Sequence, residues 1–311
     1  MSCRQSILSR ALCRSTAFAL AVGLLAVANL AVLRPVAAAG GQQRLVGSDW
    51  LLGELHDSDL VVLDARSRER YAQGHIAGAV SLPVADTFGP DPRSDLAAPI
   101  SKIQQLFGAA GVDQATRVVI YDDGDMVSAS RVFWILEVHG HRHVALLNPG
   151  YAYWETHELP VSTQPARPAA RDFVSEITPD RLATKFSTRL AISDPGVVIL
   201  DARPVAAYRG ETGGSARTGH IPTAISLPFD RNLQGTDAGL KPFSELEKIY
   251  QGIDKSKKVI TYCDKGKAST LTYFILRQLG YDVATYDGSG YEWSNDPQLP
   301  VETGGGRPTG Q

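Results

Sequence analysis

The sequence predicts two similar α/β domains in tandem, each with a parallel sheet covered by helices. Three observations support this prediction: the length of the chain, an internal repeat, and short apolar segments that alternate with amphipathic ones. At 311 residues the chain is too long for one average domain and suits two of about 100–150 residues each. Its 43% of hydrophobic residues is an ordinary content for domains that bury a core.

Internal repetition indicates that the two domains are of one kind. Three blocks of the first half return in the same order in the second half, beginning with VVLDAR…GHIAGAVSLP and VVILDAR…GHIPTAISLP. The paired blocks are residues 61–83 and 197–228, 117–136 and 258–276, and 148–161 and 287–301. Repetition of whole blocks in one order predicts a duplicated domain.

The expected domain boundaries follow from this repeat. Residues 40–161 form the first predicted domain and residues 172–311 the second. Residues 162–171, STQPARPAAR, contain two prolines and several small residues that interrupt any periodic pattern. They are therefore expected to form a linker.

The N-terminal segment, residues 1–39, has the features of a signal peptide. Three arginines occur within its first 14 residues, and residues 16–33 are apolar except for one asparagine. Small residues precede Gly40, which predicts cleavage after Ala39. Because the apolar run is longer than a usual signal core, an uncleaved membrane anchor is the alternative. In both cases we expect a periplasmic or otherwise exported protein that meets a membrane only through this leader.

Four short segments of the second half are expected to be strands. They are rich in β-branched residues and apolar on both faces, as in a parallel sheet with two covered faces. They are residues 196–200, 224–228, 257–262 and 282–286.

A helix is expected before the last strand of each half. In the second half Leu271, Phe274, Ile275 and Leu279 fall on one helical face, and Gly280 is expected to end the helix. The matching face and stop of the first half are Ala129, Val132, Phe133 and Leu136, with Gly140.

One cysteine stands in a loop whose residue types suit an activated nucleophile. Cys3 and Cys13 lie in the leader, so Cys263 is the only thiol expected in the mature chain and has no partner for an internal disulfide. It follows a predicted strand and precedes a helix, where backbone N–H groups and the helix dipole favour an anion. Together with two lysines, these groups are expected to lower the pKa of the thiol. The rest of the loop is Asp264, Lys265, Gly266, Lys267 and Ala268.

The first half has Asp122 at the matching place and no nucleophile. We expect Asp122 to be a solvated turn residue. His75 and His220 occupy equivalent GHI turns. Since one of the two histidines lies in the half without the cysteine, a structural hydrogen bond is expected for both rather than a role as general base.

These features resemble the tandem-domain rhodanese family, which comprises thiosulfate and 3-mercaptopyruvate sulfurtransferases. The resemblance covers residues 44–301 and rests on the paired LDAR…Y…GHI…A…SLP blocks, the aspartate in place of cysteine, the YC…G…AS loop and the YDGS…EW ending. It implies two rhodanese-like domains, of which only the second is catalytic. We expect no cofactor and no metal site.

The resemblance also implies roles for the loop residues. Cys263 would take a sulfane sulfur from a small anionic donor, carry it as a persulfide and pass it to an acceptor such as cyanide or a thiol. Lys265 favours thiosulfate as the donor, with 3-mercaptopyruvate second. The residues expected to bind the substrate are Asp264, Lys265, Gly266, Lys267, Ala268 and Arg203.

The sequence departs from the family pattern in two places. Thiosulfate-type loops carry an arginine directly after the cysteine, where this chain has Asp264. The arginine that precedes the tyrosine of the DAR block is present in the first half as Arg70, but the second half has Ala207 before Tyr208. A non-enzymatic persulfide carrier that serves one partner is therefore the alternative function.

Other functions are set aside. A cysteine phosphatase or arsenate reductase needs an arginine six residues after the cysteine to bind an oxyanion, and this chain has Ser269 there. A net charge of -2, with no long basic run after the leader, gives no nucleic-acid surface. The alternating histidines His139, His141 and His143 fit no common zinc spacing.

Overall fold

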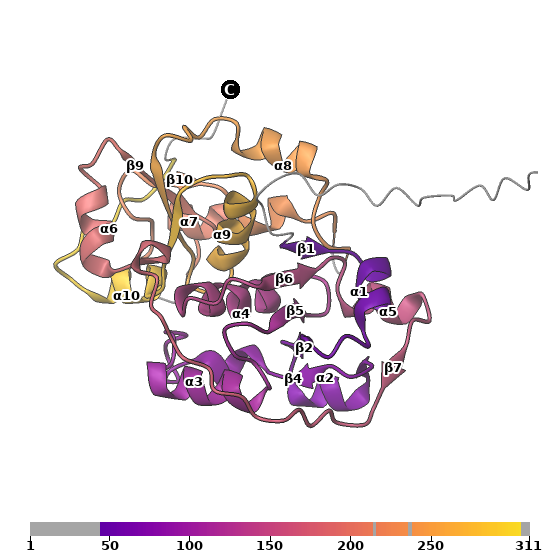
Figure 1. The fold of residues 1–311 in the computed structure, drawn as a ribbon. Coiled ribbons are helices and arrows are strands. Elements are labelled where there is room, and N and C mark those ends of the chain that lie inside the picture. The colour runs from indigo at the N-terminus through magenta and orange to yellow at the C-terminus, as the bar shows by residue number, and fades with distance from the viewer. Residues whose placement is uncertain (1–43, 214–215, 236–237, 306–311) are drawn as a thin grey trace, which may run out of the picture. The chain divides into compact units, whose positions relative to one another are not determined.

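The computed structural model describes residues 44–213, 216–235 and 238–305. The predicted signal peptide, with Cys3 and Cys13, lies outside the described residues. Within the described ranges, no helix is long and apolar enough to cross a membrane. Figure 1 shows the chain as strands and helices that alternate through two halves.

The first half contains the following elements: β1 (Leu45–Val46), α1 (Ser48–Glu54), β2 (Leu60–Asp64), α2 (Arg68–Gln73), β3 (His75–Ile76), β4 (Val80–Ser81), η1 (Val84–Thr87), α3 (Ile100–Ala109), β5 (Arg117–Tyr121), α4 (Val127–Val138), β6 (Val144–Leu147), α5 (Tyr151–Thr156) and β7 (Val161–Ser162).

The second half contains η2 (Pro179–Arg181), β8 (Leu182–Ala183), α6 (Lys185–Ala191), β9 (Val197–Asp201), α7 (Val205–Arg209), β10 (Ile225–Ser226), η3 (Phe229–Asn232), α8 (Phe243–Tyr250), β11 (Lys258–Tyr262), α9 (Ser269–Gln278), β12 (Val283–Tyr286) and α10 (Ser289–Asn295). The four strands expected in this half are present as β9, β10, β11 and β12.

Each half builds a parallel sheet of one topology. The strand orders are β1-β6-β5-β2-β4 and, written from the equivalent end, β8-β12-β11-β9-β10. In the first sheet Asp64 lies opposite Tyr121, and in the second Asp201 lies opposite Tyr262. The carboxyl ends of β9 and β11 therefore coincide, and the loop with Cys263 lies beside the segment after β9. The two α/β domains predicted from the repeat are confirmed.

One apolar core extends through both domains. It includes Leu63 and Ile120 of the first sheet, Leu200 and Val259 of the second, and the helices α3, α4, α8 and α9. Smaller clusters cover the outer face of each sheet, with α1 and α5 on the first and α6 and α10 on the second. Each sheet is therefore covered on both faces, which explains why its strands are apolar throughout.

Helix α4 is buried on more than the face that the sequence predicts. Every residue of the helix except Ser128 is buried, because α9 packs along it (Figure 1). The rings of Phe133 and Phe274 meet edge to face, with their centroids 5.0 Å apart. Gly140 and Gly280 end the two helices with φ of +84° and +81°, as expected from the sequence.

The segment from residue 163 to residue 178 has no helix or strand and lies against the first domain. Ala166 donates its N–H to the hydroxyl of Tyr71, and Arg171 donates its N–H to the carbonyl of Gly108. Just before this segment, β7 pairs with β3 in a two-stranded antiparallel ribbon. The connection between the domains is thus hydrogen-bonded to the first domain.

Candidate active site

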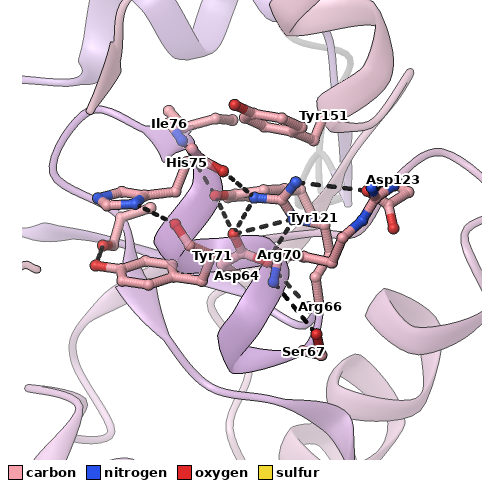
Figure 2. Close-up of polar contacts among 12 residues, drawn as sticks. Asp64, Arg66, Ser67, Arg70, Tyr71, His75, Ile76, Tyr121, Asp123 and Tyr151 are labelled. Carbon is pink, nitrogen blue, oxygen red and sulfur yellow. Dashed lines mark hydrogen bonds and ion pairs between the residues drawn. The ribbon is translucent and has the colours of Figure 1, made fainter. Parts of the chain in front are cut away.

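The same buried network of aspartate, arginine and tyrosine fixes the strand ends in both domains. In the first domain Asp64 accepts hydrogen bonds from the Arg66 guanidinium and the Tyr121 hydroxyl, both at 2.6 Å (Figure 2). In the second domain Arg203 and Tyr262 bind Asp201 in the same way, again at 2.6 Å. Burial and the neighbouring carboxylate hold the pKa of Tyr262 well above its usual range. The Tyr262 hydroxyl therefore stays protonated at ordinary pH and donates to Asp201, and the network holds the scaffold in both domains.

In each domain the arginine of the network and a nearby histidine also hold the turn that follows. Arg203 donates to the carbonyl of Gly219 at 2.8 Å. The ring of His220 lies 2.8 Å from the carbonyl of Tyr208 through Nδ1 and stacks on the Tyr208 ring with centroids 3.7 Å apart. His75 makes the same contacts with Tyr71 in the first domain. The structural hydrogen bond expected for both histidines is present.

Cys263 lies directly after β11 with 4% of its surface exposed. The chain curls around its sulfur, and the N–H of Gly266 donates to Sγ at 3.2 Å. Gly266 has a φ of +88°, and a Cβ added there would lie 2.4 Å from the carbonyl oxygen of Asp287. Only glycine fits this position without moving the backbone, so the curl that aims an N–H at the sulfur depends on it.

The segment that begins α10 supports the loop from behind. The N–H of Cys263 donates to the Ser289 hydroxyl at 3.2 Å, and that hydroxyl donates to the carbonyl of Tyr286 at 2.8 Å. Gly290 and Tyr291 donate their N–H groups to the carbonyls of Cys263 and Asp264, at 2.8 and 2.7 Å. These bonds fix the backbone of the cysteine from the side opposite the curl.

The charged side chains of the loop lie at its mouth. Asp264 is exposed, and its carboxylate lies 3.8 Å from Nη1 of Arg203. Burial of part of its surface raises the pKa of Asp264, and the Arg203 charge opposes this shift. Lys265 is half-buried, with Nζ 5.7 Å from the centre of the Tyr291 ring. The mouth of the loop thus combines two positive side chains with one carboxylate.

The structure brings all the predicted site residues to one place. Lys267 and Ala268 are half-buried and lead into α9. Arg203 joins them through Nη1, which lies 3.8 Å from the carboxylate of Asp264 and would lie 3.5 Å from a Cβ at Gly290. Its other nitrogens serve Asp201 and Gly219, so the contact of Arg203 with substrate stays a prediction.

The loop of the first domain shows what this backbone geometry binds. Asp122 is 2% exposed, and its carboxylate accepts N–H bonds from Gly124 at 3.0 Å, Met126 at 3.1 Å and Ala129 at 2.9 Å. Burial, with the nearby charge of Asp125, raises the pKa of Asp122 to about 7. The expectation of a solvated turn residue was wrong, because the loop folds its donors onto this side chain. The loop thus directs three N–H donors at one compact acceptor, an arrangement that also suits an anion.

The first domain keeps a pocket beside this filled loop. Its volume is about 430 Å³, and Arg66, Arg68 and Arg70 line it together with Asp122 and Asp123. Arg70 lies 3.3 Å from Asp123, which also faces Arg66 at 3.4 Å (Figure 2). The arginine that is replaced by Ala207 in the second domain is thus present here but paired with a carboxylate.

Two residues near the loop were not found by sequence analysis. Asp287 follows β12, and Arg131 comes from α4 of the first domain; the two form a buried ion pair at 2.6 Å. Both lie in repeated blocks, but nothing in the local sequence shows that they meet. Asp287 begins a repeated block, but its counterpart Asn148 is uncharged.

Comparison with known proteins agrees with this geometry. A family model described as rhodanese-like domain matches residues 48–157 and 186–296. The thiosulfate sulfurtransferase of Azotobacter vinelandii is 33% identical over 259 residues, which cover 81% of this chain and 94% of that protein. The 3-mercaptopyruvate sulfurtransferase of Escherichia coli (strain K12) is 28% identical over 280 residues, covering 83% and 97%.

A solved structure shares the fold. The crystal structure of a 3-mercaptopyruvate sulfotransferase from Escherichia coli matches with a TM-score of 0.73 at 26% identity, covering 79% of this chain and 98% of that chain. The fold and the cysteine loop define a tandem α/β protein with a buried free thiol, Cys263, in the loop of its second domain. The chain belongs to the rhodanese family, with two rhodanese-like domains, as its sequence features predicted. Its relatives support sulfurtransferase activity.

Proposed function

We propose that the protein transfers a sulfane sulfur from thiosulfate or 3-mercaptopyruvate, through a persulfide on Cys263, to an acceptor such as a thiol or cyanide. The Cys263 thiolate attacks the outer sulfur of thiosulfate, an S–S bond forms, and sulfite leaves with the electron pair of the broken bond. The acceptor then attacks the same outer sulfur and releases the thiolate. No net oxidation of the cysteine results from a full cycle.

One observation supports this proposal above the others: the loop donates an N–H to Sγ of Cys263. In the first domain the same curl holds a whole carboxylate with three N–H donors. A persulfide extends beyond Sγ by one atom and carries its negative charge there, at the position along the side chain that the oxygens of Asp122 occupy. The loop is therefore suited to stabilise both the thiolate and the persulfide anion.

The charges at the mouth of the loop suit a small anionic donor. Lys265 and Lys267 flank the glycine that caps the sulfur, and Arg203 offsets the charge of Asp264 at 3.8 Å. This pairing reduces the repulsion that Asp264 alone would exert on thiosulfate. We propose thiosulfate as the preferred donor and 3-mercaptopyruvate as the second.

A non-enzymatic persulfide carrier is the second candidate, and one observation favours it. The position before Tyr208 holds Ala207, which is 7% exposed, so this position of α7 offers the donor no arginine. Such a carrier would accept sulfur once and deliver it to a single partner. Steady-state turnover with thiosulfate and cyanide separates the two functions, because a carrier shows loading without turnover.

The decisive experiment measures the mass of the protein after mixing with each donor. A gain of one sulfur atom on the peptide that contains Cys263 identifies the donor that loads the site. Cys263→Ser should abolish this gain and leave thermal unfolding unchanged, because a hydroxyl is nearly isosteric with the buried thiol. Transfer activity that persists in Cys263→Ser would contradict the proposal.

We propose that the protein acts in the periplasm or another exported compartment. The proposal rests on residues 1–39, whose composition is that of a signal peptide. Cell fractionation with sequencing of the mature N-terminus tests it. An N-terminus at Gly40 in the exported fraction supports cleavage, and a protein retained in the cytoplasm contradicts the proposal.

A further inference from the structure

We propose that Arg131, from the domain without a nucleophile, positions the cysteine loop of the other domain. Its guanidinium donates to the carbonyl of Gly266 at 3.1 Å and to the carboxylate of Asp287 at 2.6 Å. A third bond, at 2.7 Å, reaches the carbonyl of Asp95. Arg131 therefore contacts the residue whose N–H donates to Cys263, and this inference rests on the proposed role of that cysteine.

The arginine holds both sides of the curl. Gly266 lies so close to Asp287 that no Cβ fits between them. Arg131 bonds the carbonyl of the first and the side chain of the second. The other oxygen of the Asp287 carboxylate accepts a hydrogen bond from the N–H of Ala97, also in the first domain, at 2.8 Å. The direction of the Gly266 peptide, and with it the N–H bond to sulfur, is thus set by contacts across the domain interface.

The fold itself does not require a charge at this place. When the two domains are aligned on the glycines that end α4 and α9, Leu271 is the counterpart of Arg131. Asn148 is the counterpart of Asp287, because each directly follows the matching strand, β6 or β12. The amide oxygen of Asn148 accepts the N–H of Leu240 from the opposite domain at 2.8 Å. This pair of equivalent positions is thus neutral in one copy, Leu271 and Asn148. It is an ion pair, Arg131 and Asp287, in the copy that contacts the cysteine loop.

Burial of this ion pair carries a desolvation penalty, so its presence calls for a reason other than stability. Arg131 is fully buried, and Asp287 is 7% exposed. A buried pair contributes little to stability compared with apolar residues of similar size, and Nε of Arg131 has no hydrogen-bond partner among the described residues. The guanidinium is therefore better explained by the loop contacts that a leucine cannot make.

The pair also affects the electrostatics of the thiol. Removing Arg131 alone leaves an unpaired carboxylate next to Gly266, which opposes a thiolate at Cys263. The charged groups around the loop include Asp264, Lys265 and Lys267 on the loop, Asp287 after β12, Asp201 and Arg203 at the end of β9, Arg131 on α4, and Asp91 and Arg93 in the segment between η1 and α3.

Three full-length variants test the proposal. Arg131→Leu leaves Asp287 unpaired, and Arg131→Leu with Asp287→Asn recreates the neutral residues of the other side. Phe133→Leu is the matched control, since it weakens the same interface at the ring of Phe274 without touching the loop. Two quantities are measured for each: the pH dependence of iodoacetamide alkylation, followed on the Cys263 peptide by mass spectrometry, and the rate of sulfur loading from thiosulfate or 3-mercaptopyruvate.

Arg131→Leu should raise the pH midpoint of alkylation by about one unit, because an unpaired carboxylate disfavours the thiolate. The double variant should return the midpoint to near the wild-type value but load sulfur about tenfold more slowly, because the Gly266 peptide is no longer held. Phe133→Leu should keep both the midpoint and the loading rate of the wild type.

Loading by the double variant at the wild-type rate would overturn the positioning role. A midpoint in Arg131→Leu equal to that of Phe133→Leu would overturn the electrostatic part. If Arg131→Leu does not fold, the double variant decides the positioning role, and Arg131→Lys decides the electrostatic part by keeping the wild-type midpoint. A wild-type protein that takes sulfur from neither donor would reject the proposed function, while the alkylation data still test Arg131.

Discussion

Replacing Gly266 by alanine separates backbone strain from the chemistry of the loop, because Gly280 offers a matched control. The two glycines have nearly the same φ, +88° and +81°. A Cβ at Gly280 meets nothing within 4 Å, whereas a Cβ at Gly266 would lie 2.4 Å from the carbonyl oxygen of Asp287. Gly280→Ala therefore measures the cost of a left-handed alanine, and Gly266→Ala adds the displacement of the loop.

The structure sets the expected magnitudes. A left-handed alanine costs about 1–2 kcal/mol, so Gly280→Ala should lower the melting temperature by about 2–6 °C for a chain of this size. Gly266→Ala should lower it further, since backbone must move away from backbone. The displaced N–H loses its bond to the thiolate, worth about 1.5–3 kcal/mol for a charged acceptor, so sulfur loading should slow by about ten- to a hundredfold.

Two assays on both variants give the answer. Thermal unfolding followed by circular dichroism measures the loss of stability, and the mass gain of the Cys263 peptide after rapid mixing with donor measures loading. Gly280→Ala should load sulfur at the wild-type rate. Equal loading rates in the two alanine variants would refute the claim that the Gly266 N–H stabilises the sulfur anion.

Three further predictions concern charge and hydrogen bonding. The folded state keeps a proton on Asp122 up to pH about 7, so this residue makes the free energy of unfolding fall as pH rises from about 4 to about 7. Urea unfolding across this range should show a weaker fall for Asp122→Asn than for the wild type. The same pH dependence in both proteins would contradict this prediction. Lys265→Ala should raise the KM for thiosulfate with little change in kcat, whereas the exposed Lys248→Ala should change neither; steady-state kinetics that do not separate the two variants would mean that Lys265 is merely solvated. Tyr262→Phe and Tyr121→Phe each remove a 2.6 Å hydrogen bond to a buried aspartate, and each should lower the free energy of chemical unfolding by about 1.5–3 kcal/mol. Only Tyr262→Phe should slow sulfur loading. Equal loading rates in the two variants would show that the end of β11 does not position the cysteine.

Much of the fold was predictable because the sequence states it twice. The repeated blocks, the β-branched strands and the glycine stops are local patterns, and the two sheets and the helices α4 and α9 lie where they predict. The second, inter-domain face of α4 was not predicted. Its burial depends on α9, which is more than a hundred residues further along the chain.

The candidate site was predictable in part for the same reason. Cys263 and the residues up to Ala268 form one continuous loop, so the sequence alone shows that they lie together. Asp122 was misjudged, since a carboxylate between turn residues looks solvated until the backbone donors close on it. Arg131 was missed because its partners Gly266 and Asp287 are 135 and 156 residues away.

The sequence by itself determined the duplicated α/β architecture and the position of one thiol in a strand-to-helix loop, since both follow from short-range patterns of residue type. Tertiary structure alone decided that Arg131 and Asp287 form a buried ion pair, and that the side chain of Asp122 is closed off from solvent. Burial and ion pairing depend on which distant segments come into contact, and no local pattern records that contact.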